Sequence, residues 1–283
     1  MYPVRDFEYG VPWESQLLIC GSCGLVTHDP AITAEDIPEL YPSTYHAYTG
    51  GSQGKGLYWK LRKAWATFAM RGVLSHLPRG GRLLEVGCGN GSFLRLVAEA
   101  RPDVALHGID IVDTHIEDIP GLVFHEGMLE TTDLPGDFDV IYFNNLIEHV
   151  PDPVAFLDKC YRILRPGGVI YGNTPDHLSL DRYLFGRYWA GYHYPRHTFV
   201  FNHDNMRKIL EQCGYEDIEL KGSYAFWSLS LRNIFMERHG PKKRGLVHAA
   251  ITIGMLPFDL LVNVFRCHGA MTFIGRAPAR DGN

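Results

Sequence analysis

The stretch LLEVGCGNG, residues 83–91, decides how the surrounding chain is read. Its first four residues are apolar except Glu85, glycines follow at positions 87, 89 and 91, and an apolar run with helical spacing begins at Ser92. A strand that enters such a turn lets a ligand approach the backbone, because glycine has no side chain to collide and accepts positive φ. The spacing is not the Gly-x-Gly-x-x-Gly typical of dinucleotide sites. We therefore expect a ligand-binding turn of another kind.

Strand-like and helix-like segments alternate around this turn. We expect strands at 82–86, 105–109, 138–143 and 169–172, helices at 57–77, 92–100 and 154–164, and a turn at 165–168. Such alternation predicts an α/β fold with a doubly wound parallel sheet and helices on both faces. In a sheet of this type, the functional residues follow the carboxyl ends of the strands.

Five motifs in order resemble those of the class I S-adenosylmethionine-dependent methyltransferases, including ubiquinone O-methyltransferase-like enzymes and bacterial sugar and natural-product methyltransferases. They are EVGCGNG at 85–91, GID at 108–110, FDVI at 138–141, EHVPDP at 148–153 and LRPGG at 164–168. The resemblance implies a Rossmann-like sheet of about seven strands with an antiparallel final strand. It also implies S-adenosylmethionine as the cofactor. The implied cofactor-binding residues are Glu85, Gly87, Cys88, Gly89, Gly91, Asp110, Ile111, Met128, Leu129, Asn144, Asn145 and Tyr45.

Two acidic residues have a physical reason to belong to this site. Asp110 lies at the expected end of the second strand, where a carboxylate can accept hydrogen bonds from both ribose hydroxyls. The alternative for Asp110 is a helix cap or a solvated loop. Glu85 is costly inside a strand without partners, which fits a role in organising the turn or the ligand's ammonium group; an ordinary edge position is the alternative.

The remaining cofactor residues follow from the resemblance. Met128 and Leu129 match the stretch that packs against adenine, although many relatives have Asp where Met128 stands. They would supply apolar contacts to the ring. Asn144 and Asn145 follow a strand and should face the methionine part of the cofactor; they are equally plausible as turn residues.

The acceptor's base should lie outside the shared motifs. A sulfonium methyl donor is already activated, so the enzyme has to align the acceptor and remove its proton. The segment YWAGYHYPRH at 188–197 offers His193 and His197 as bases. Arg196 in the same segment could bind an anionic group through two hydrogen bonds. Trp189 and Tyr192 would contact the acceptor. Alternatively, His197 caps the next helix and both rings are core.

His149 belongs to the EHVPDP motif, which recurs in methyltransferases with unrelated acceptors. We place it second as a base, and a structural histidine is its favoured interpretation.

The N-terminal segment, 1–50, is expected to be an appendage. Cys20 and Cys23 resemble the second half of a zinc ribbon, but the first Cys-x-x-Cys is absent and four ligands normally close such a site. Even with His28 as a third ligand, we predict a hairpin without metal. A tyrosine-rich stretch at 41–48, which includes Tyr45, would be a lid over the cofactor or merely an anchor for the appendage.

The C-terminal part, 176–283, should hold the acceptor side, and 51–175 the cofactor-binding core. We expect an antiparallel pair at 215–220 and 270–275, separated by about fifty residues of helical insertion. Tyr224 and Trp227 in this insertion would contact the acceptor. A basic cluster at 242–244 beside an apolar run suggests peripheral membrane contact through 242–265. A dimer interface or an intramolecular lid is the favoured alternative.

The amino-acid composition narrows the classes of function that remain. Lys and Arg total 27 against 32 Asp and Glu, a net charge of -5, which disfavours a nucleic-acid footprint. Only Cys20 and Cys23 of the six cysteines lie close together, and the first residues contain no apolar leader, so we expect a reducing, cytoplasmic compartment. The sequence thus predicts O-methylation of a sugar, phenol or natural-product hydroxyl, with oligomerisation open. The alternatives are N- or C-methylation of a small molecule, or a silent cofactor-binding partner protein.

Overall fold

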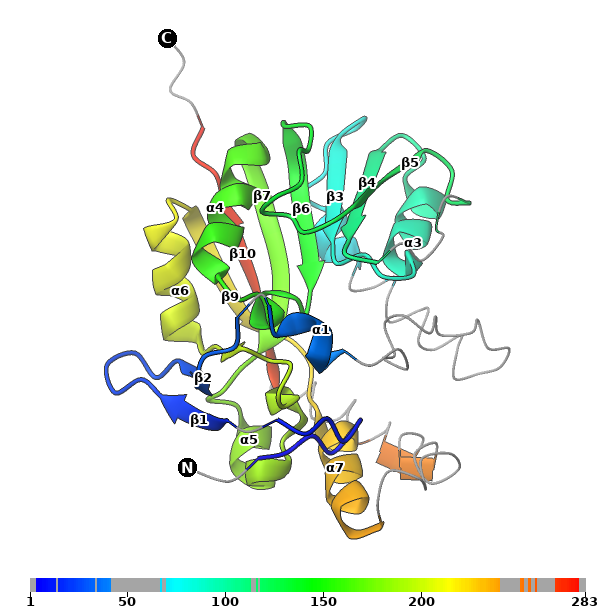
Figure 1. Cartoon of the computed structure of the whole chain (residues 1–283). Helices are drawn as coiled ribbons and strands as arrows, with labels where there is room; N and C mark the ends of the chain where they lie inside the picture. The colour runs from blue at the N-terminus through cyan, green and yellow to red at the C-terminus, as the bar shows by residue number, and fades with distance from the viewer. Residues whose placement is uncertain are drawn as a thin grey trace.

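A computed structural model describes residues 4–13, 15–33, 35–41, 67, 70–112, 116, 118–239, 250–251, 254–255, 258 and 268–279 (Figure 1). Its main sheet contains β3 (Arg82–Val86), β4 (Ala105–Asp110), β5 (Leu122–Glu126), β6 (Phe138–Asn144), β7 (Leu164–Pro175), β9 (Glu216–Gly222) and β10 (Ala270–Arg276). The strand order is β5-β4-β3-β6-β7-β10-β9. Strands β5, β4, β3, β6 and β7 pair in parallel, and β10 is antiparallel to both β7 and β9. The predicted α/β class and the antiparallel final strand are confirmed.

Two predictions for this sheet were incomplete. Strand β5 was not expected, because LVFHE at 122–126 is short and has partly exposed residues on both faces. The turn expected at 165–168 is instead part of β7, whose pairing with β6 jumps from Phe138–Leu164 to Val140–Val169. The extra residues form a bulge in which Gly167 has φ of 74°.

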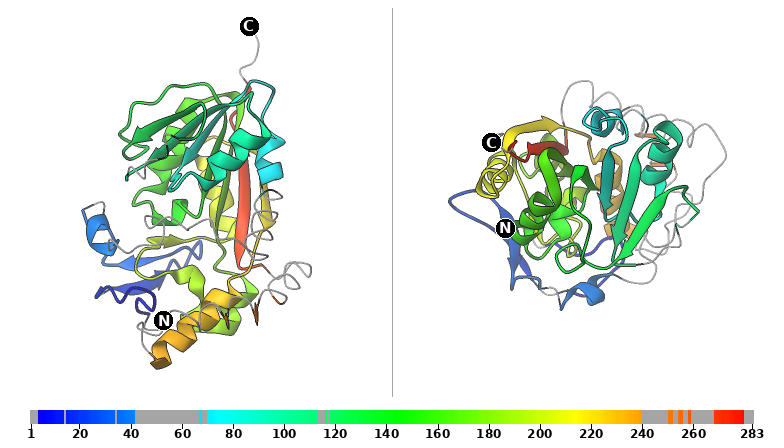
Figure 2. Two further views of the ribbon diagram at one scale, coloured as in Figure 1. Left: turned by 90° about the vertical axis from the view of Figure 1, so that its right-hand side faces the viewer. Right: turned by 90° about the horizontal axis from the view of Figure 1, so that it is seen from above.

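Each face of the sheet has its own hydrophobic core (Figure 2). On one face, Phe156 and Leu157 of α4 (Pro153–Ile163) and Met206 of α6 (His203–Gln212) pack on β6 and β7. On the other, Leu94 of α3 (Ser92–Ala100) and Val73 pack on β3 and β4. The sheet is therefore covered on both sides, and its exposed functional edge is the one where the parallel strands end.

The N-terminal segment is built into the structure through a second sheet. Strands β1 (Gln16–Ile19) and β2 (Val26–Asp29) form the expected hairpin, and β2 also pairs with β8 (Phe199–Val200). Helix α1 (Ile37–Leu40) follows. The side chain of His28 bonds to Ser15 Oγ at 2.6 Å through Nδ1 and donates from Nε2 to the His197 carbonyl at 3.0 Å. His28 thus ties the hairpin to 193–197 and does not turn toward Cys20 and Cys23.

Short helices follow β7 along the chain: α5 (Leu180–Phe185), η2 (Gly186–Tyr188) and η3 (Ala190–Tyr192). They gather with α7 (Trp227–His239) and the N-terminal strands beyond the end of β6 (Figure 1). The 3-10 turn η1 (Ile147–His149) connects β6 to α4. No helix within the described ranges has the length and apolarity to cross a bilayer. Tyr45, the basic cluster 242–244 and most of 242–265 lie outside the described residues.

Candidate functional site

A large pocket of about 1210 Å³ opens where β3, β4 and β6 end. Its cofactor end includes Gly87, Gly89, Asp110, Met128 and Asn144. Its other end is made by the N-terminal segment, by residues between 187 and 197, and by α7. The pocket therefore lies at the carboxyl edge of the sheet, where the strand pattern predicts the functional residues.

The glycine turn is held by the backbone of the neighbouring strand. Gly87 and Gly89 have φ of 69° and 49°, and the Gly87 amide donates to the Ile109 carbonyl at 2.8 Å. A side chain at Gly87 would meet Leu146 at 3.1 Å. Gly91 does not line the pocket; a Cβ there would lie 2.7 Å from Ile119. Cys88 is also buried away from the pocket, and burial raises the pKa of its thiol.

Asp110 at the end of β4 fixes the turn and faces the pocket. Its Oδ2 accepts from the Gly89 amide at 2.8 Å, and its Oδ1 accepts from the Val112 amide at 3.2 Å. Burial nevertheless raises the pKa of the carboxyl. Each oxygen retains a lone pair, so the carboxylate can still accept from a diol.

Glu85 lies below the turn, within β3. It is buried, it does not line the pocket, and its Oε2 has no hydrogen-bond partner within the described chain. Burial, with a smaller contribution from the Asp110 charge, raises the pKa of Glu85 well above its usual range. An unsatisfied buried carboxyl is costly and is commonly retained where a ligand needs it.

The residues after β4, β5 and β6 complete this end. Ile111, Met128 and Leu129 all line the pocket; Ile111 and Met128 are 47% and 37% exposed, and Leu129 is buried. Exposed apolar side chains on a pocket wall suit the faces of an aromatic ring.

Asn144 and Asn145 are oriented by specific hydrogen bonds. Asn173 Nδ2 donates to Asn144 Oδ1 at 3.1 Å, and Tyr224 Oη donates to Asn145 Oδ1 at 2.6 Å. Asn145 has φ of 49°. Tyr224 does not line the pocket, so it acts through Asn145 and not on an acceptor.

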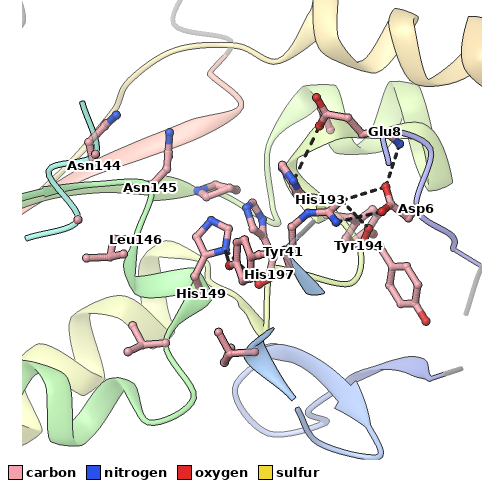
Figure 3. Close-up of a pocket in the computed structure, with 18 of the residues that line it drawn as sticks. Asp6, Glu8, Tyr41, Asn144, Asn145, Leu146, His149, His193, Tyr194 and His197 are labelled. Atoms are coloured by element: carbon pink, nitrogen blue, oxygen red, sulfur yellow. Dashed lines mark hydrogen bonds and ion pairs between the residues drawn. The ribbon is translucent and has the colours of Figure 1, made fainter. Parts of the chain in front are cut away.

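Three histidines meet beside Asn145 and Leu146 (Figure 3). The ring of His149 lies edge-on to His197, with centroids 4.5 Å apart, and His193 stacks on His197 at 5.1 Å. Their approach depends on the tertiary structure, since His149 follows β6 whereas the other two follow η3.

His197 is directed toward the protein interior. Its Nδ1 donates to the Gly191 carbonyl at 2.8 Å, and its Nε2 lies 3.9 Å from Glu148 Oε1. Burial, then the neighbouring His149, lowers the pKa of His197 well below its usual range, while burial raises that of Glu148 to about 8. Helix α6 is capped by Asn202 and not by His197.

His193 has φ of 33°, and its Nε2 lies 3.8 Å from Glu8 Oε2. His149 Nδ1 lies 3.1 Å from the Arg196 carbonyl and 2.8 Å from the hydroxyl of Tyr41. The N-terminal segment therefore contacts two of the three histidines directly.

The predicted acceptor residues divide into two groups. Trp189 and Tyr192 line the pocket and also belong to a buried cluster. Arg196 is completely buried, and its guanidinium forms two 2.9 Å hydrogen bonds with the Asp6 carboxylate, so it is not available to grip an anion as expected. Trp227 does not line the pocket; it packs against Phe185 and Phe258.

A sequence profile for a methyltransferase domain family matches residues 58–220, more than half of the chain. The chain belongs to the class I S-adenosylmethionine-dependent methyltransferases. The predicted family is confirmed, and so is the predicted cofactor, S-adenosylmethionine.

The curated relatives match only part of this chain. A probable S-adenosylmethionine-dependent methyltransferase of Mycolicibacterium smegmatis is 32% identical over 146 residues, and the match covers 50% of this chain and 55% of the relative. A ubiquinone biosynthesis O-methyltransferase of Cereibacter sphaeroides is 30% identical over 185 residues, 58% of this chain and 74% of the relative. The chain thus spans about half the length of the first relative and about three quarters of the second.

Solved structures agree on the fold. Phosphoethanolamine N-methyltransferase 2 of Haemonchus contortus, in complex with S-adenosylmethionine, gives a TM-score of 0.52 at 18% identity, covering 75% of this chain and 52% of that one. A putative methyltransferase of Haloferax volcanii gives 0.52 at 19% identity, with 77% and 91% covered.

The residues of this methyltransferase fit the cofactor. Gly87 and Gly89 line the pocket with backbone alone, Asp110 offers acceptors for ribose hydroxyls, and the Glu85 carboxyl lies buried within β3. Met128 and Ile111 offer apolar surface for adenine, and Asn144 and Asn145 remain proposed contacts of the methionine part.

One group among the described residues brings possible metal ligands together: Glu148, His149 and His197 have ligand atoms within 4.8 Å of one another. The absence of a metal stays a prediction, for this group as for Cys20 and Cys23.

Several pocket residues were missed by sequence reasoning. Asp6, Glu8, Arg187 and Arg232 carry charges in the pocket wall, yet nothing in their local sequence marks them. Tyr41 was noticed only as part of a possible lid. A usable signal existed only in α7, where residues 228, 229, 232, 233 and 236 recur with helical spacing and all face the pocket.

Proposed function

We propose that the protein transfers a methyl group from S-adenosylmethionine to a hydroxyl oxygen of a small molecule, with His149 as the base. The choice of His149 as the base is supported by the contact between its Nδ1 and the Arg196 carbonyl at 3.1 Å. A carbonyl oxygen can only accept, and the Tyr41 hydroxyl, 2.8 Å from the same nitrogen, can accept as well as donate, so we assign the proton to Nδ1, where it satisfies both contacts. Nε2 is then the basic nitrogen of the ring.

The position of His149 supports this role. Its imidazole lies in the pocket wall next to Leu146 and Asn145, at the junction of the cofactor end and the acceptor end (Figure 3). Bound S-adenosylmethionine supplies an activated methyl group. His149 would take the acceptor's hydroxyl proton at Nε2 as the oxygen–methyl bond forms, while the pocket walls align the acceptor.

His193 and His197 are less suited to this task than the sequence suggested. His197 Nε2 faces Glu148 in the interior, and His193 Nε2 faces Glu8. We assign them positioning roles, because the rings of His193 and His197 both pack against the ring of His149.

The relatives support the reaction class. A ubiquinone biosynthesis O-methyltransferase matches more than half of this chain, which favours a phenolic or similar hydroxyl over an amine or a carbon. We propose a small-molecule acceptor and no nucleic acid. The reducing, cytoplasmic compartment indicated by the cysteines stays a prediction, as do the oligomeric state and the membrane contact through 242–265.

The test compares His149→Asn with wild type on a panel of catechols, phenols and sugar hydroxyls. An asparagine amide reproduces the Nδ1–H donor and removes the basic nitrogen. We expect turnover to fall by roughly 10²- to 10⁴-fold with unchanged affinity for S-adenosylhomocysteine. His193→Asn, the matched control, should lose much less. Equal activity of His149→Asn and wild type would reject His149 as the base. Tight cofactor binding without turnover on any acceptor would instead favour a silent partner protein.

A further inference from the structure

The carboxamide of Asn145 has a fixed orientation where the two ends of the pocket meet. Asn145 lines the pocket directly after β6 and lies beside the histidine cluster (Figure 3). Its φ of 49° is left-handed, a conformation that Asn tolerates better than most residues. Its backbone amide donates to the Asn173 carbonyl at 3.0 Å, so β7 holds the turn in place. Sparsely populated backbone conformations that their surroundings maintain are commonly found at functional sites.

Tyr224 determines which atom of the Asn145 carboxamide faces the pocket. Its hydroxyl donates to Asn145 Oδ1 at 2.6 Å. Burial raises the pKa of Tyr224, so this hydroxyl keeps its proton and remains a donor. The carbonyl of Tyr224 accepts from the amides of Gly269 and Ala270 at 2.7 and 2.8 Å, which anchors the residue to the start of β10. Because its oxygen is engaged by a residue outside the pocket, the carboxamide offers the N–H donors of Nδ2 to the pocket.

Asn144 has the same polarity through a different chain of hydrogen bonds. Thr272 Oγ1 donates to Asn173 Oδ1, and Asn173 Nδ2 donates to Asn144 Oδ1 at 3.1 Å. Asn144 therefore also presents its Nδ2 to the pocket that it lines. Within the described residues, neither Asn144 Nδ2 nor Asn145 Nδ2 has a hydrogen-bond partner. Both amides are thus fixed as donors, and the complementary ligand atoms are oxygens that accept.

A fixed donor stabilises most strongly an oxygen on which negative charge develops. In the proposed reaction, the acceptor's hydroxyl proton goes to His149 Nε2, an electron pair of the oxygen forms the bond to the methyl carbon, and the carbon–sulfur electron pair returns to sulfur. Charge therefore develops on the acceptor oxygen as its proton leaves. Asn145 precedes His149 on the same connection, and both line the pocket. A donor at Asn145 would bind this oxygen more tightly as its charge grows.

We propose that Asn145 is a catalytic residue whose Nδ2–H donates to the acceptor oxygen that loses its proton, and that Tyr224 is the positioning residue that orients this amide. The inference rests on the proposed function for the identity of the reacting oxygen. Asn145 itself neither gains nor loses a proton. This role replaces the contact with the methionine part that the sequence predicts for Asn145, whereas Asn144 keeps that contact.

The test measures the ionisation of bound 4-nitrophenol, whose anion absorbs visible light, on protein saturated with S-adenosylhomocysteine. Asn145→Gly removes the donor and accepts the positive φ without strain. We expect the bound phenol to ionise about one pH unit higher in this variant than in wild type, because a hydrogen bond to the charged form favours that form. Tyr224→Phe, which leaves the amide free to turn, should give a smaller shift in the same direction. Both variants retain the three histidines and Glu148, so the shifts report on the amide.

Tyr215→Phe is the matched control for the lost hydroxyl. Tyr215 Oη donates to the Leu157 carbonyl at 2.9 Å and does not line the pocket, so the bound phenol should ionise as in wild type. On an acceptor that wild type methylates, Asn145→Gly should also lower kcat by roughly 10²-fold, while the KM for S-adenosylmethionine changes little.

Ionisation of the bound phenol at the same pH in wild type and Asn145→Gly would overturn the proposal. Loss of S-adenosylhomocysteine affinity in Asn145→Gly without a shift in this ionisation would overturn it too, and would assign Asn145 to the methionine part. Failure of wild type to bind 4-nitrophenol would also count against it, because the site is proposed for a phenolic or similar hydroxyl. Failure of His149→Asn to lower turnover would reject only the proposed base, since the ionisation of the bound phenol requires no turnover.

Discussion

The two ends of the pocket are built in different ways. The cofactor end comes from loops after three adjacent strands, and its contacts are mostly backbone hydrogen bonds such as Gly87 to Ile109. The acceptor end joins segments up to 190 positions apart in the chain, as in the pair of Asp6 and Arg196. A site made by adjacent strand ends is repeated wherever the fold is repeated, whereas a site made by distant segments can vary with each insertion.

The largest effect is expected from breaking the buried ion pair between Asp6 and Arg196 at the acceptor end. Asp6→Ala leaves the Arg196 guanidinium buried without its partner and should lower the free energy of unfolding by about 3–5 kcal/mol. Because Arg196→Met leaves a carboxyl that can take up a proton, it should cost less. The measurement is denaturant unfolding of both variants and of the double variant, which should recover part of the loss.

Affinity for S-adenosylhomocysteine in Asp6→Ala is the companion measurement. If the two ends are built independently, it should change less than about threefold. A loss as large as that of a cofactor-end variant would show that the N-terminal segment also shapes the cofactor end and that the two ends are not independent.

The second prediction concerns the cofactor end. Asp110→Ala removes the acceptor of the Gly89 amide and of the proposed ribose hydroxyls, and it should weaken S-adenosylhomocysteine roughly 100-fold, measured by calorimetry. Asp103→Ala is the matched control, since Asp103 also accepts from a glycine amide, that of Gly80, far from the pocket. Similar affinities of the two variants would contradict the assignment of Asp110.

The smallest effect is a pH dependence carried by His28. Burial lowers the pKa of His28 to about 4, against 6.5 as the ordinary value. The neutral ring therefore stabilises the N-terminal hairpin above pH 6.5, and this stabilisation is lost as the pH falls toward 4. The contribution lost by pH 5 is about 2 kcal/mol.

Denaturant unfolding of wild type and His28→Asn at several pH values checks this prediction. The difference in free energy of unfolding should be largest above pH 6.5, shrink between pH 6.5 and 4, and stay constant below that. A difference that does not vary with pH would contradict the assigned neutral, buried state of His28.

The cofactor end can be predicted from local sequence, whereas the acceptor end cannot. Residues of the glycine turn and Asp110 were identified because a strand, a turn and a helix of fixed spacing determine their positions locally. Strand β5 was missed because its apolar pattern is weak, and the bulge in β7 was read as a turn because Arg-Pro-Gly-Gly is typical of turns. Arg196 was expected to bind the acceptor, since the sequence does not show that Asp6 neutralises it.

The sequence by itself determined the α/β class, the glycine turn, the carboxylate after β4 and the cofactor. These depend on hydrophobic periodicity and on backbone geometry within a few residues. Only the tertiary structure decided that His149 points its Nδ1 to a backbone carbonyl, that Tyr41 from the N-terminal segment contacts it, and that Arg5 and Arg187 share Glu237. The physical reason is that charge, burial and protonation depend on neighbours in space, and here those neighbours come from opposite ends of the chain.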